Sequence, residues 1–379
     1  MGSLNKKAAI VGTALSDCGV VPDKTAMELA AQAAKLALDD AGLVKEDIDA
    51  LFNTGLPGGT LQLGEYLQIE PSISDSTSVG GASFEFHLQH ATAAIAAGLC
   101  HTALICFGGT PRSDATRAAR TTMHSTGNSY ESPFGGFLIA GYALAAQRHM
   151  YQYGTTSEQL AEIAVATRKW ASMNPTATMR GPMEIEDVIN SPMISSPLHL
   201  RDCCLVSDAG GAIIVTSAER ARNLRKPPVW VLGCGESHSH TSISSMPDLT
   251  TLSAKKSGEA AFKMAGLTPK DVDVAELYDS FTITVLLELE DLGFCQKGEG
   301  GSFVEGQRTA PGGEFPMNTN GGGLSWNHAG PYGLFPLIEA TRQLRDECGE
   351  RQVPEPRVAL CNGVGGTLSS SGTIILGRD

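Results

Sequence analysis

Three short segments late in the chain combine residues that can carry out acid–base or covalent chemistry with turns rich in glycine. The segment MNTNGGGLSWNHAGPYG contains His328 and Tyr332, and the segment ALCNGVGG places Cys361 at the end of an apolar run. The segment VAELYDSFT places Tyr278 at the end of another such run. In proteins of alternating strands and helices, ligands bind where strands end. A single buried histidine or cysteine is more often structural, but three such clusters together predict a site of proton transfer or covalent catalysis.

A fourth segment, TSVGGASFEF, predicts a turn between a strand and a buried helix. The apolar run meets Gly80 and Gly81, and a long helical pattern follows. A turn of this kind presents a nucleophile above the N-terminus of a helix in many enzymes. No nucleophile stands at the turn itself, and we expect the hydroxyl of Ser83 to cap the helix rather than to attack a substrate. On these residues alone the segment is either a catalytic turn that lacks its reactive residue or an ordinary loop.

The composition excludes several classes of protein. The chain has 379 residues, of which 42% are hydrophobic, enough for a large core and at least two lobes. No run of about 18 apolar residues is present, and the first residues lack the apolar segment of a secretion signal. Nine cysteines are scattered without a CxxC pair, which indicates a reduced, cytoplasmic chain without a metal site. With a net charge of −13 and no long basic block, we expect neither a nucleic-acid nor a membrane partner.

An internal repeat indicates two similar halves. ALDDAGLVKEDID at 37–49 matches AFKMAGLTPKDVD at 261–273, and each reads as a helix that ends at glycine, a turn and a strand. ALICFGG at 103–109 matches VALCNGVGG at 358–366, and GGAIIVTS at 210–217 matches SGTIILGR at 371–378. Such units also recur by chance in α/β proteins, but here their order is kept. We therefore predict two α/β halves, 1–225 and 226–379, that pack face to face.

A long polar excursion at about 110–200 interrupts the first half. It carries several basic residues between Arg112 and Arg180. A loop of this length is typical of a lid or a binding element, and a solvated surface insertion is the alternative.

These motifs resemble the thiolase superfamily over the whole chain, and most of all the branch related to the thiolase of sterol carrier proteins. The three late segments are similar to that family's NxxGG…GHPxG, CxGxGG and NEAF motifs. The resemblance implies a five-layered αβαβα fold of two duplicated halves with a loop domain inserted in the first. It implies that His328 is the histidine of the first motif and that Cys361 is a cysteine that shuttles a proton. ELYDSF stands in place of NEAF, so that the usual asparagine is missing and Tyr278 lies in the motif.

The same resemblance places Gly81 where the family carries its acyl-accepting cysteine. Glycine cannot form an acyl-enzyme, and Phe84 stands where a small residue is usual. The chain also resembles lipid-transfer-type aldolases, which shorten steroid side chains without that cysteine and use tyrosines in the motifs that hold Tyr278 and Tyr332. These relatives work with a small partner that carries a zinc ribbon and an OB fold. The resemblance thus implies retro-aldol cleavage of a β-hydroxyacyl-CoA by a homodimer, with or without such a partner, and no tightly bound cofactor.

The candidate site residues follow from these motifs. Four are expected to be catalytic: Tyr278, Tyr332, His328 and Cys361. Four are expected to bind the substrate: Gly81, Ser83, Asn318 and Gly363. We expect both tyrosine hydroxyls to face the cavity that holds Gly81. Because the pKa of tyrosine is ordinarily near 10, a nearby cation or hydrogen bond would have to lower the pKa of a tyrosine that acts as a base.

Two other functions remain open on the sequence. The first is C–C bond formation by acyl transfer, with Cys361 recruited to carry the acyl group or a proton. The second is a non-catalytic subunit that binds acyl-CoA or supports a partner. We expect Gly81→Cys to form an acyl adduct with a short acyl-CoA, unless Phe84 or its neighbours close the pocket.

Overall fold

The computed structural model describes residues 4–114, 131, 133 and 138–379. The expected loop domain at about 110–200 therefore falls partly outside the described residues, and this includes two of its arginines, Arg117 and Arg120.

The first part of the chain builds five strands and their connecting helices. In chain order these are β1 (Ala8–Leu15), α1 (Ala26–Ala41), β2 (Ala50–Phe52), α2 (Gly59–Leu67), β3 (Ile73–Asp75), α3 (Ser83–Ala96), β4 (Thr102–Gly109) and β7 (Ala209–Ser217). The described residues between β4 and β7 form α5 (Leu138–Tyr153), α6 (Ser157–Ser172), α7 (Ile185–Ile189) and a small hairpin of β5 (Met193–Ser195) and β6 (Leu198–His199).

The second part repeats this plan with fewer elements. After the short α8 (Ala218–Ala221) come β8 (Val229–His238), α9 (Ala254–Ala265), β9 (Val274–Leu277), α10 (Thr282–Asp291), α11 (Gly300–Val304), α12 (Leu334–Leu344), β10 (Val358–Gly365) and β11 (Ser370–Gly377).

The sequence repeat has a direct structural counterpart. Helix α1 ends at Gly42 and helix α9 ends at Gly266, and both glycines have φ = 69°. A left-handed residue after the last turn is the usual helix stop, and glycine adopts it without steric cost. Each stop is followed by a short 3₁₀ turn, at 45–47 and 269–271, and then by a buried strand, β2 or β9. The other two pairs of repeated segments also form matching strands: one pair forms β4 and β10, and the other forms β7 and β11.

Within the described residues, the strands form a nine-stranded sheet in the order β3-β2-β4-β7-β1-β8-β11-β10-β9. In the first part β1 and β4 pair antiparallel with β7, and β4 pairs parallel with β2. In the second part β8 and β10 pair antiparallel with β11, and β10 pairs parallel with β9. The two parts therefore share one strand order and one set of directions, and they join where β1 pairs with β8.

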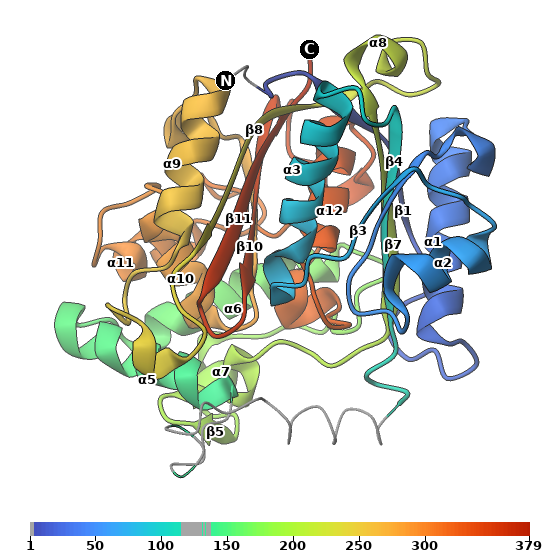
Figure 1. Ribbon diagram of the computed structural model, residues 1–379. Helices are drawn as coiled ribbons and strands as arrows, with labels where there is room; N and C mark the ends of the chain where they lie inside the picture. Colours follow the sequence, from blue (N-terminus) through green and yellow to red (C-terminus); the bar gives the residue numbers. More distant parts are fainter. Residues whose placement is uncertain (1–3, 115–130, 132, 134–137) are drawn as a thin grey trace.

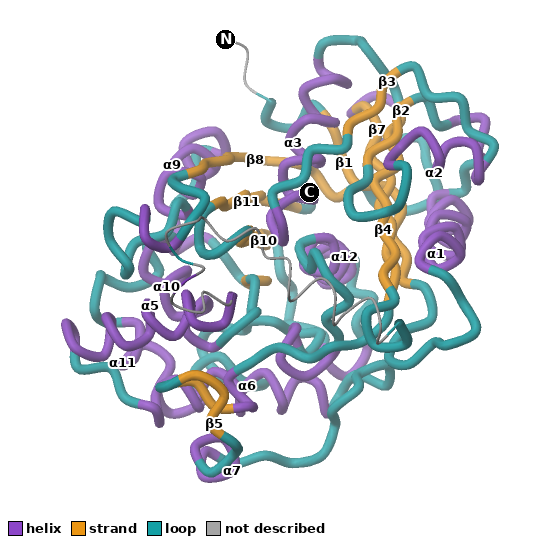
Figure 2. The backbone as a smooth tube through the Cα atoms, turned by 60° about the horizontal axis from the view of Figure 1, so that its bottom comes forward, coloured by secondary structure: helices purple, strands orange, loops and turns teal. Residues whose placement is uncertain are grey.

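The sheet bends so that its two parts enclose helices α3 and α12, which gives five layers. Figure 1 shows α9, then β8, β11 and β10, then α3 and α12, then the strands of the first part, and finally α1 with α2. Figure 2 shows α3 and α12 between the two parts from another side, with α5, α6 and α7 grouped beyond their ends. This is the αβαβα arrangement that the sequence predicts.

The central helices are apolar because sheet packs against both of their sides. In α3 the buried residues include Phe84, Phe86 and Leu88, and in α12 they run from Leu334 to Leu344 with few interruptions. Such helices must begin and end where backbone groups are satisfied, since few of their side chains reach water. Their N-terminal ends therefore lie in the glycine-rich turns that the sequence singled out.

Candidate functional site

The segment TSVGGASFEF forms the expected turn into a buried helix. Residues 80–82 make one 3₁₀ turn, and α3 begins at Ser83. Gly80 has φ = 73°, and a Cβ at this position would lie 2.7 Å from the backbone nitrogen of Gly366, so that only glycine fits. The Ser83 hydroxyl accepts a hydrogen bond from the Val79 N–H (2.9 Å) and donates one to the Gly80 carbonyl (2.6 Å). Ser83 thus holds the turn together rather than capping a later N–H of the helix.

The phenol of Tyr278 occupies the space beside Gly81. A Cβ built on Gly81 would lie closer than 3.0 Å to the Cε2, Cζ and Oη atoms of Tyr278. A side chain at position 81 and the observed Tyr278 ring therefore exclude each other. The sequence expectation was that Phe84 or its neighbours close this pocket, but the Phe84 ring packs against His87 and Phe107 in the core. The residue that closes the pocket is Tyr278.

Tyr278 is held at the end of β9 by backbone hydrogen bonds. Its N–H donates to the carbonyl of Asn362 on β10 (3.1 Å) and lies 3.2 Å from Oε1 of Glu288 on α10. Asn362 donates to the same Glu288 oxygen (2.6 Å). This places the ring in the layer between the two parts of the sheet, and its side chain is 5% exposed.

Tyr278, His328 and Tyr332 form a compact aromatic cluster. The Tyr278 hydroxyl lies 3.3 Å from Nε2 of His328 and 3.4 Å from the Tyr332 N–H. The rings of His328 and Tyr332 stack with centroids 5.6 Å apart, and the ring of Tyr278 meets both of them edge-on. Two of the three late sequence motifs therefore meet at this cluster.

The glycine-rich turn before His328 is anchored by buried polar contacts. Asp279, which follows Tyr278, accepts hydrogen bonds from the N–H groups of Gly323 (2.6 Å) and Leu324 (3.1 Å). The His328 N–H donates to the Ser207 hydroxyl at 2.8 Å. Burial raises the pKa of Asp279 to about 6, and the two backbone N–H groups counter part of that rise. These contacts fix the position of the imidazole relative to Tyr278.

The hydroxyl of Tyr332 is directed differently from the sequence expectation. It lies 3.1 Å from the Nδ2 atom and 3.3 Å from the Oδ1 atom of Asn320. The ring of Tyr332 thus lines the cluster, while its hydroxyl is bound to an amide in the preceding turn. Of the two tyrosines, only Tyr278 places its hydroxyl beside Gly81.

Cys361 lies on β10, paired with Glu276 on β9, and its thiol is fully buried. The Sγ atom lies 3.5 Å from the carbonyl of Pro336, its hydrogen-bond acceptor on α12. Burial raises the pKa of this thiol well above its usual value, and the carboxyl groups of Glu276 and Glu85 raise it further. A cysteine that forms an acyl-enzyme needs a lowered pKa, so this environment favours the neutral thiol.

The remaining expected binding residues have identifiable structural contacts. Asn318, with φ = 52°, accepts a hydrogen bond on Oδ1 from the Leu277 N–H (2.7 Å) and so ties its turn to β9. Gly363 lies on β10, where a Cβ would come within 2.8 Å of the Cα of Ala82. Gly363 therefore permits the close approach of the first turn of α3. Both residues shape the site, and their contact with a substrate stays a prediction.

Burial dominates the proton affinities of the cluster. It lowers the pKa of His328 to about 4, so that the imidazole is neutral near pH 7. It raises the pKa of Tyr278 well above 10, and the nearby Tyr142 and Cys204 raise it further. The Tyr332 N–H counters only part of this rise. The expectation that the surroundings lower the pKa of a catalytic tyrosine is wrong for Tyr278.

Glu85, which the sequence analysis did not single out, lies one helical turn after Gly81. Its side chain is buried on α3 beside the glycines at 333 and 363. The available signal was a charged residue in the first turn of a helix that the glycine-rich turn leads into the core. A carboxyl group in such a position is unusual, because buried charge is costly unless it is paired.

The excursion in the first half also reaches the site. The hydroxyl of Tyr142 on α5 donates to the carbonyl of Gly366, next to Gly80 (3.0 Å), and Arg168 on α6 donates to Ser325 in the glycine-rich turn (2.9 Å). The described residues of this excursion therefore cover the ends of the central helices and support the turns that hold the cluster.

No group of three or more His, Cys, Asp or Glu side chains in the described ranges could hold a metal ion, and no described helix is long and apolar enough to cross a membrane.

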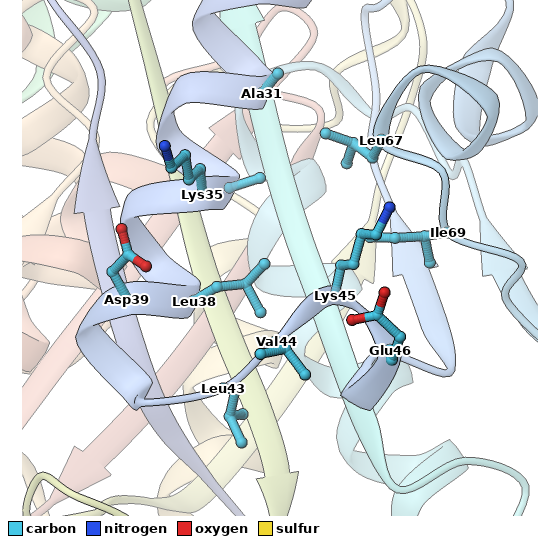
Figure 3. Close-up of a pocket in the computed structure, with 11 residues that line it drawn as sticks. Ala31, Lys35, Leu38, Asp39, Leu43, Val44, Lys45, Glu46, Leu67 and Ile69 are labelled. Atoms are coloured by element: carbon cyan, nitrogen blue, oxygen red, sulfur yellow. The ribbon is translucent and has the colours of Figure 1, made fainter.

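A groove on the described chain lies apart from this cluster. Figure 3 shows a groove of about 380 Å³ lined by residues of α1, the turn after it and the end of α2. The groove lies in the outer layer, away from Tyr278 after β9 and from Cys361, which lies within β10 rather than at the strand end that the sequence predicts.

Comparisons with known proteins agree with this architecture. Residues 235–378 match the family described as thiolase C-terminal domain-like. The chain is 32% identical to an acetyl-CoA acetyltransferase of Methanothermobacter thermautotrophicus, over 98% of this chain and 100% of that protein. It is 32% identical to a steroid side-chain-cleaving aldolase of Thermomonospora curvata, over the full length of both. The solved Ltp2-ChsH2(DUF35) aldolase superposes with a TM-score of 0.90 at 30% identity, over 100% of this chain and 99% of that one.

Proposed function

Because the chain belongs to the thiolase superfamily, in the branch that includes steroid side-chain-cleaving aldolases and resembles sterol carrier protein 2, we propose that it cleaves a β-hydroxyacyl-CoA by a retro-aldol reaction. The acyl-CoA is a substrate, and no tightly bound cofactor is needed for this chemistry. The main support for this proposal is the position of Tyr278, whose phenol fills the space beside Gly81 and contacts Nε2 of His328.

The position of Tyr278 argues against an acyl-enzyme at the turn. A thiolase-type cysteine would project its side chain from position 81, and that is where the Tyr278 ring lies. A retro-aldol cleavage needs no nucleophile. It needs a group that removes a proton from the β-hydroxyl, stabilisation of the thioester enolate, and an acid that protonates the enolate carbon.

The Tyr278–His328 pair can supply the base as a relay. The phenol accepts the proton of the substrate hydroxyl while it passes its own proton to the neutral imidazole. The bond between the α- and β-carbons then breaks, the β-carbon leaves as a carbonyl compound, and the electron pair remains on the thioester as an enolate. The His328 pKa of about 4 makes the imidazolium a transient species that releases its proton to water, and the raised pKa of Tyr278 requires no phenolate before the reaction.

The turn at residues 80–83 supports the enolate. The N-terminus of α3 lies there, and the unpaired N–H groups of a helix N-terminus favour negative charge. Stabilisation of an oxyanion by one such donor typically contributes a factor of about 10²–10³ in rate. We assign the thioester oxygen to the backbone N–H groups of this turn.

The function is tested with a panel of β-hydroxyacyl-CoA substrates, with and without a small candidate partner protein. Mass spectrometry should detect a shortened acyl-CoA together with a ketone or an aldehyde in equal amounts. Tyr278→Phe should lower turnover by about 10²–10⁴-fold, because general acid–base catalysis typically contributes that much. A covalent acyl adduct on the wild-type protein, with no cleavage of any substrate in the panel, would contradict the proposal.

Acyl transfer is the second candidate, because one full-length relative is an acetyl-CoA acetyltransferase. On that hypothesis Cys361→Ala should be the most damaging change, while Tyr278→Phe should leave activity nearly normal. The neutral, fully buried thiol favours the opposite ranking. A non-catalytic role would leave every substrate in the panel unchanged in all variants.

The assembly is a separate part of the proposal. Strand β3 is an edge of the sheet in the described chain, so that its outer side is free to pair with a second copy across a two-fold axis. The similar solved aldolase is named for two proteins, Ltp2 and ChsH2(DUF35). We therefore propose a homodimer that also binds a small partner with a zinc ribbon and an OB fold.

We further propose that the chain divides into two halves, 1–225 and 226–379. We also propose a cytoplasmic location, where the free cysteines stay reduced.

A further inference from the structure

Glu85 is a buried carboxylic acid that the relay described above does not use. Its side chain is 1% exposed, and neither carboxyl oxygen has a hydrogen-bond partner in the part of the chain that the structure describes. Leaving such a group unpaired inside a protein costs free energy, and a group of this kind in a native fold calls for an explanation.

The carboxyl lies directly behind the turn at Gly81. A Cβ placed on Gly333 would lie closer than 3.0 Å both to the Glu85 carboxyl oxygens and to the Gly81 carbonyl oxygen, so these groups border one small space. A Cβ on Gly363 would also lie closer than 3.0 Å to the same carboxyl. Glycines at 333 and 363 are therefore what leaves room for Glu85.

The groups that face Glu85 come from several elements. Cys361 lies two residues before Gly363 on β10, so that both point to the same face of the sheet. Tyr278, after β9, and Glu288, on α10, are close enough to interact with the Glu85 charge. Gly333 immediately follows Tyr332 and donates its N–H to the Gly81 carbonyl (3.1 Å). The carboxyl thus shares the interior of the site with the Tyr278 cluster.

A carboxyl in this position is neutral near pH 7. Burial raises the pKa of Glu85 to about 8, and no described neighbour donates a hydrogen bond that would stabilise the carboxylate. A protonated carboxyl donates a proton, whereas the thiol of Cys361 holds its proton more tightly.

We propose that Glu85 is the acid that protonates the enolate carbon after the carbon–carbon bond breaks. This inference rests on the proposed retro-aldol function. In the step the O–H bond of Glu85 breaks and a C–H bond forms at the α-carbon, which leaves a carboxylate. Water carries a proton back to that carboxylate, and the proton held by His328 returns to water, so that no proton is gained or lost over one turnover.

Hydrogen exchange tests the role of Glu85 independently of the cleavage reaction. In D₂O the wild-type protein should exchange the α-hydrogens of propionyl-CoA, because the Glu85 carboxylate removes them and its deuterated form returns them. Glu85→Gln keeps the size of the side chain but cannot transfer a proton, so exchange should fall by about 10²–10⁴-fold. Glu65→Gln, on the exposed side of α2, is the matched control and should exchange at the wild-type rate.

The pH dependence of the wild-type protein gives a readout that needs no variant. Cleavage requires the acid form of Glu85 and should slow as the pH rises through about 8. Exchange begins with the carboxylate form and should accelerate over the same range. A structural role for Glu85 would not move the two rates in opposite directions.

Three results would overturn the assignment. If Glu85→Gln exchanges propionyl-CoA at the wild-type rate while the wild-type protein cleaves β-hydroxyacyl-CoA, the retro-aldol function stands and Glu85 is not the acid. If Cys361→Ala abolishes exchange and Glu85→Gln does not, the acid is Cys361. A wild-type protein that neither cleaves nor exchanges would refute both the function and the role of Glu85.

Discussion

Filling the space beside Gly81 tests the central geometric argument. In Gly81→Ala the new Cβ would lie closer than 3.0 Å to the Tyr278 ring, whereas non-bonded carbon atoms prefer about 3.5–4.0 Å. The ring must therefore move by about 1 Å. That shift takes the Tyr278 hydroxyl, now 3.3 Å from Nε2 of His328, beyond hydrogen-bond distance. Overpacking of a tight core typically costs about 1–3 kcal/mol, so we expect a folded but less stable protein.

Turnover should fall much more than stability. Loss of the Tyr278–His328 contact removes the proton relay, which is expected to lower turnover by about 10²–10⁴-fold. Steady-state cleavage of a β-hydroxyacyl-CoA measures the loss of turnover, and chemical unfolding measures the loss of stability. Gly181→Ala is the control, because a Cβ at that position meets no atom within 4 Å. Normal turnover of Gly81→Ala would refute the assignment of the Tyr278 ring to this space.

A single and a double substitution test whether a cysteine at position 81 can form an acyl adduct. Gly81→Cys alone should form no acyl adduct with acetyl-CoA, because Tyr278 occupies the place of the thiol. This reverses the expectation drawn from the sequence. The double variant Gly81→Cys with Tyr278→Ala removes the ring and should form the adduct, which intact-protein mass spectrometry detects. An adduct on the single variant at the rate of the double variant would show that Tyr278 does not block the position.

Three further predictions follow from contacts elsewhere in the site. Tyr332→Phe should lower turnover less than Tyr278→Phe in steady-state assays, because its hydroxyl is bound to an amide rather than directed at the cavity. Arg351→Met should lower the free energy of unfolding, measured with urea, by about 3–5 kcal/mol, since it leaves the buried Glu339 carboxylate without its two-bond partner. The pKa of Glu85 rises from 4.5 to about 8 on folding, so the wild-type protein should lose stability as the pH rises through this range. Glu85→Gln should therefore become the more stable protein at pH 9, by up to about 5 kcal/mol in urea unfolding.

Much of the fold follows from local signals in the sequence. The stops at Gly42 and Gly266 depend on the backbone conformation of one residue, and the apolar strands after them are short and continuous. Such signals lie within a few residues of each other, so the sequence alone predicts these helix ends and the strands that follow them. The proximity of Tyr278 to His328 was also predictable, because the family resemblance places both residues in motifs of one active site.

The parts of the site that the sequence did not predict depend on contacts between distant segments. The direction of the Tyr332 hydroxyl depends on Asn320, whose turn is set by buried contacts with another segment. The raised pKa of Tyr278 depends on burial, which no local pattern reports. The role of Glu85 depends on glycines more than 240 residues away in the chain, at 333 and 363, that leave room for its carboxyl.

The pairing of Gly81 with Tyr278 shows why the chemistry of this site must be inferred from two positions together. A glycine at the turn alone indicates only that covalent catalysis is absent. A tyrosine after β9 alone is equally consistent with a packing residue, because buried phenols are common in cores. Each becomes informative through the other, since the ring fits only where position 81 lacks a side chain. The space that a side chain at position 81 would need holds a hydroxyl beside an imidazole, and the N-terminus of α3, to which we assign the thioester oxygen, begins in the same turn. Under the proposed function, the Tyr278 ring therefore excludes acyl transfer through position 81 of this chain, and enolate chemistry supported by the turn needs no acyl-enzyme.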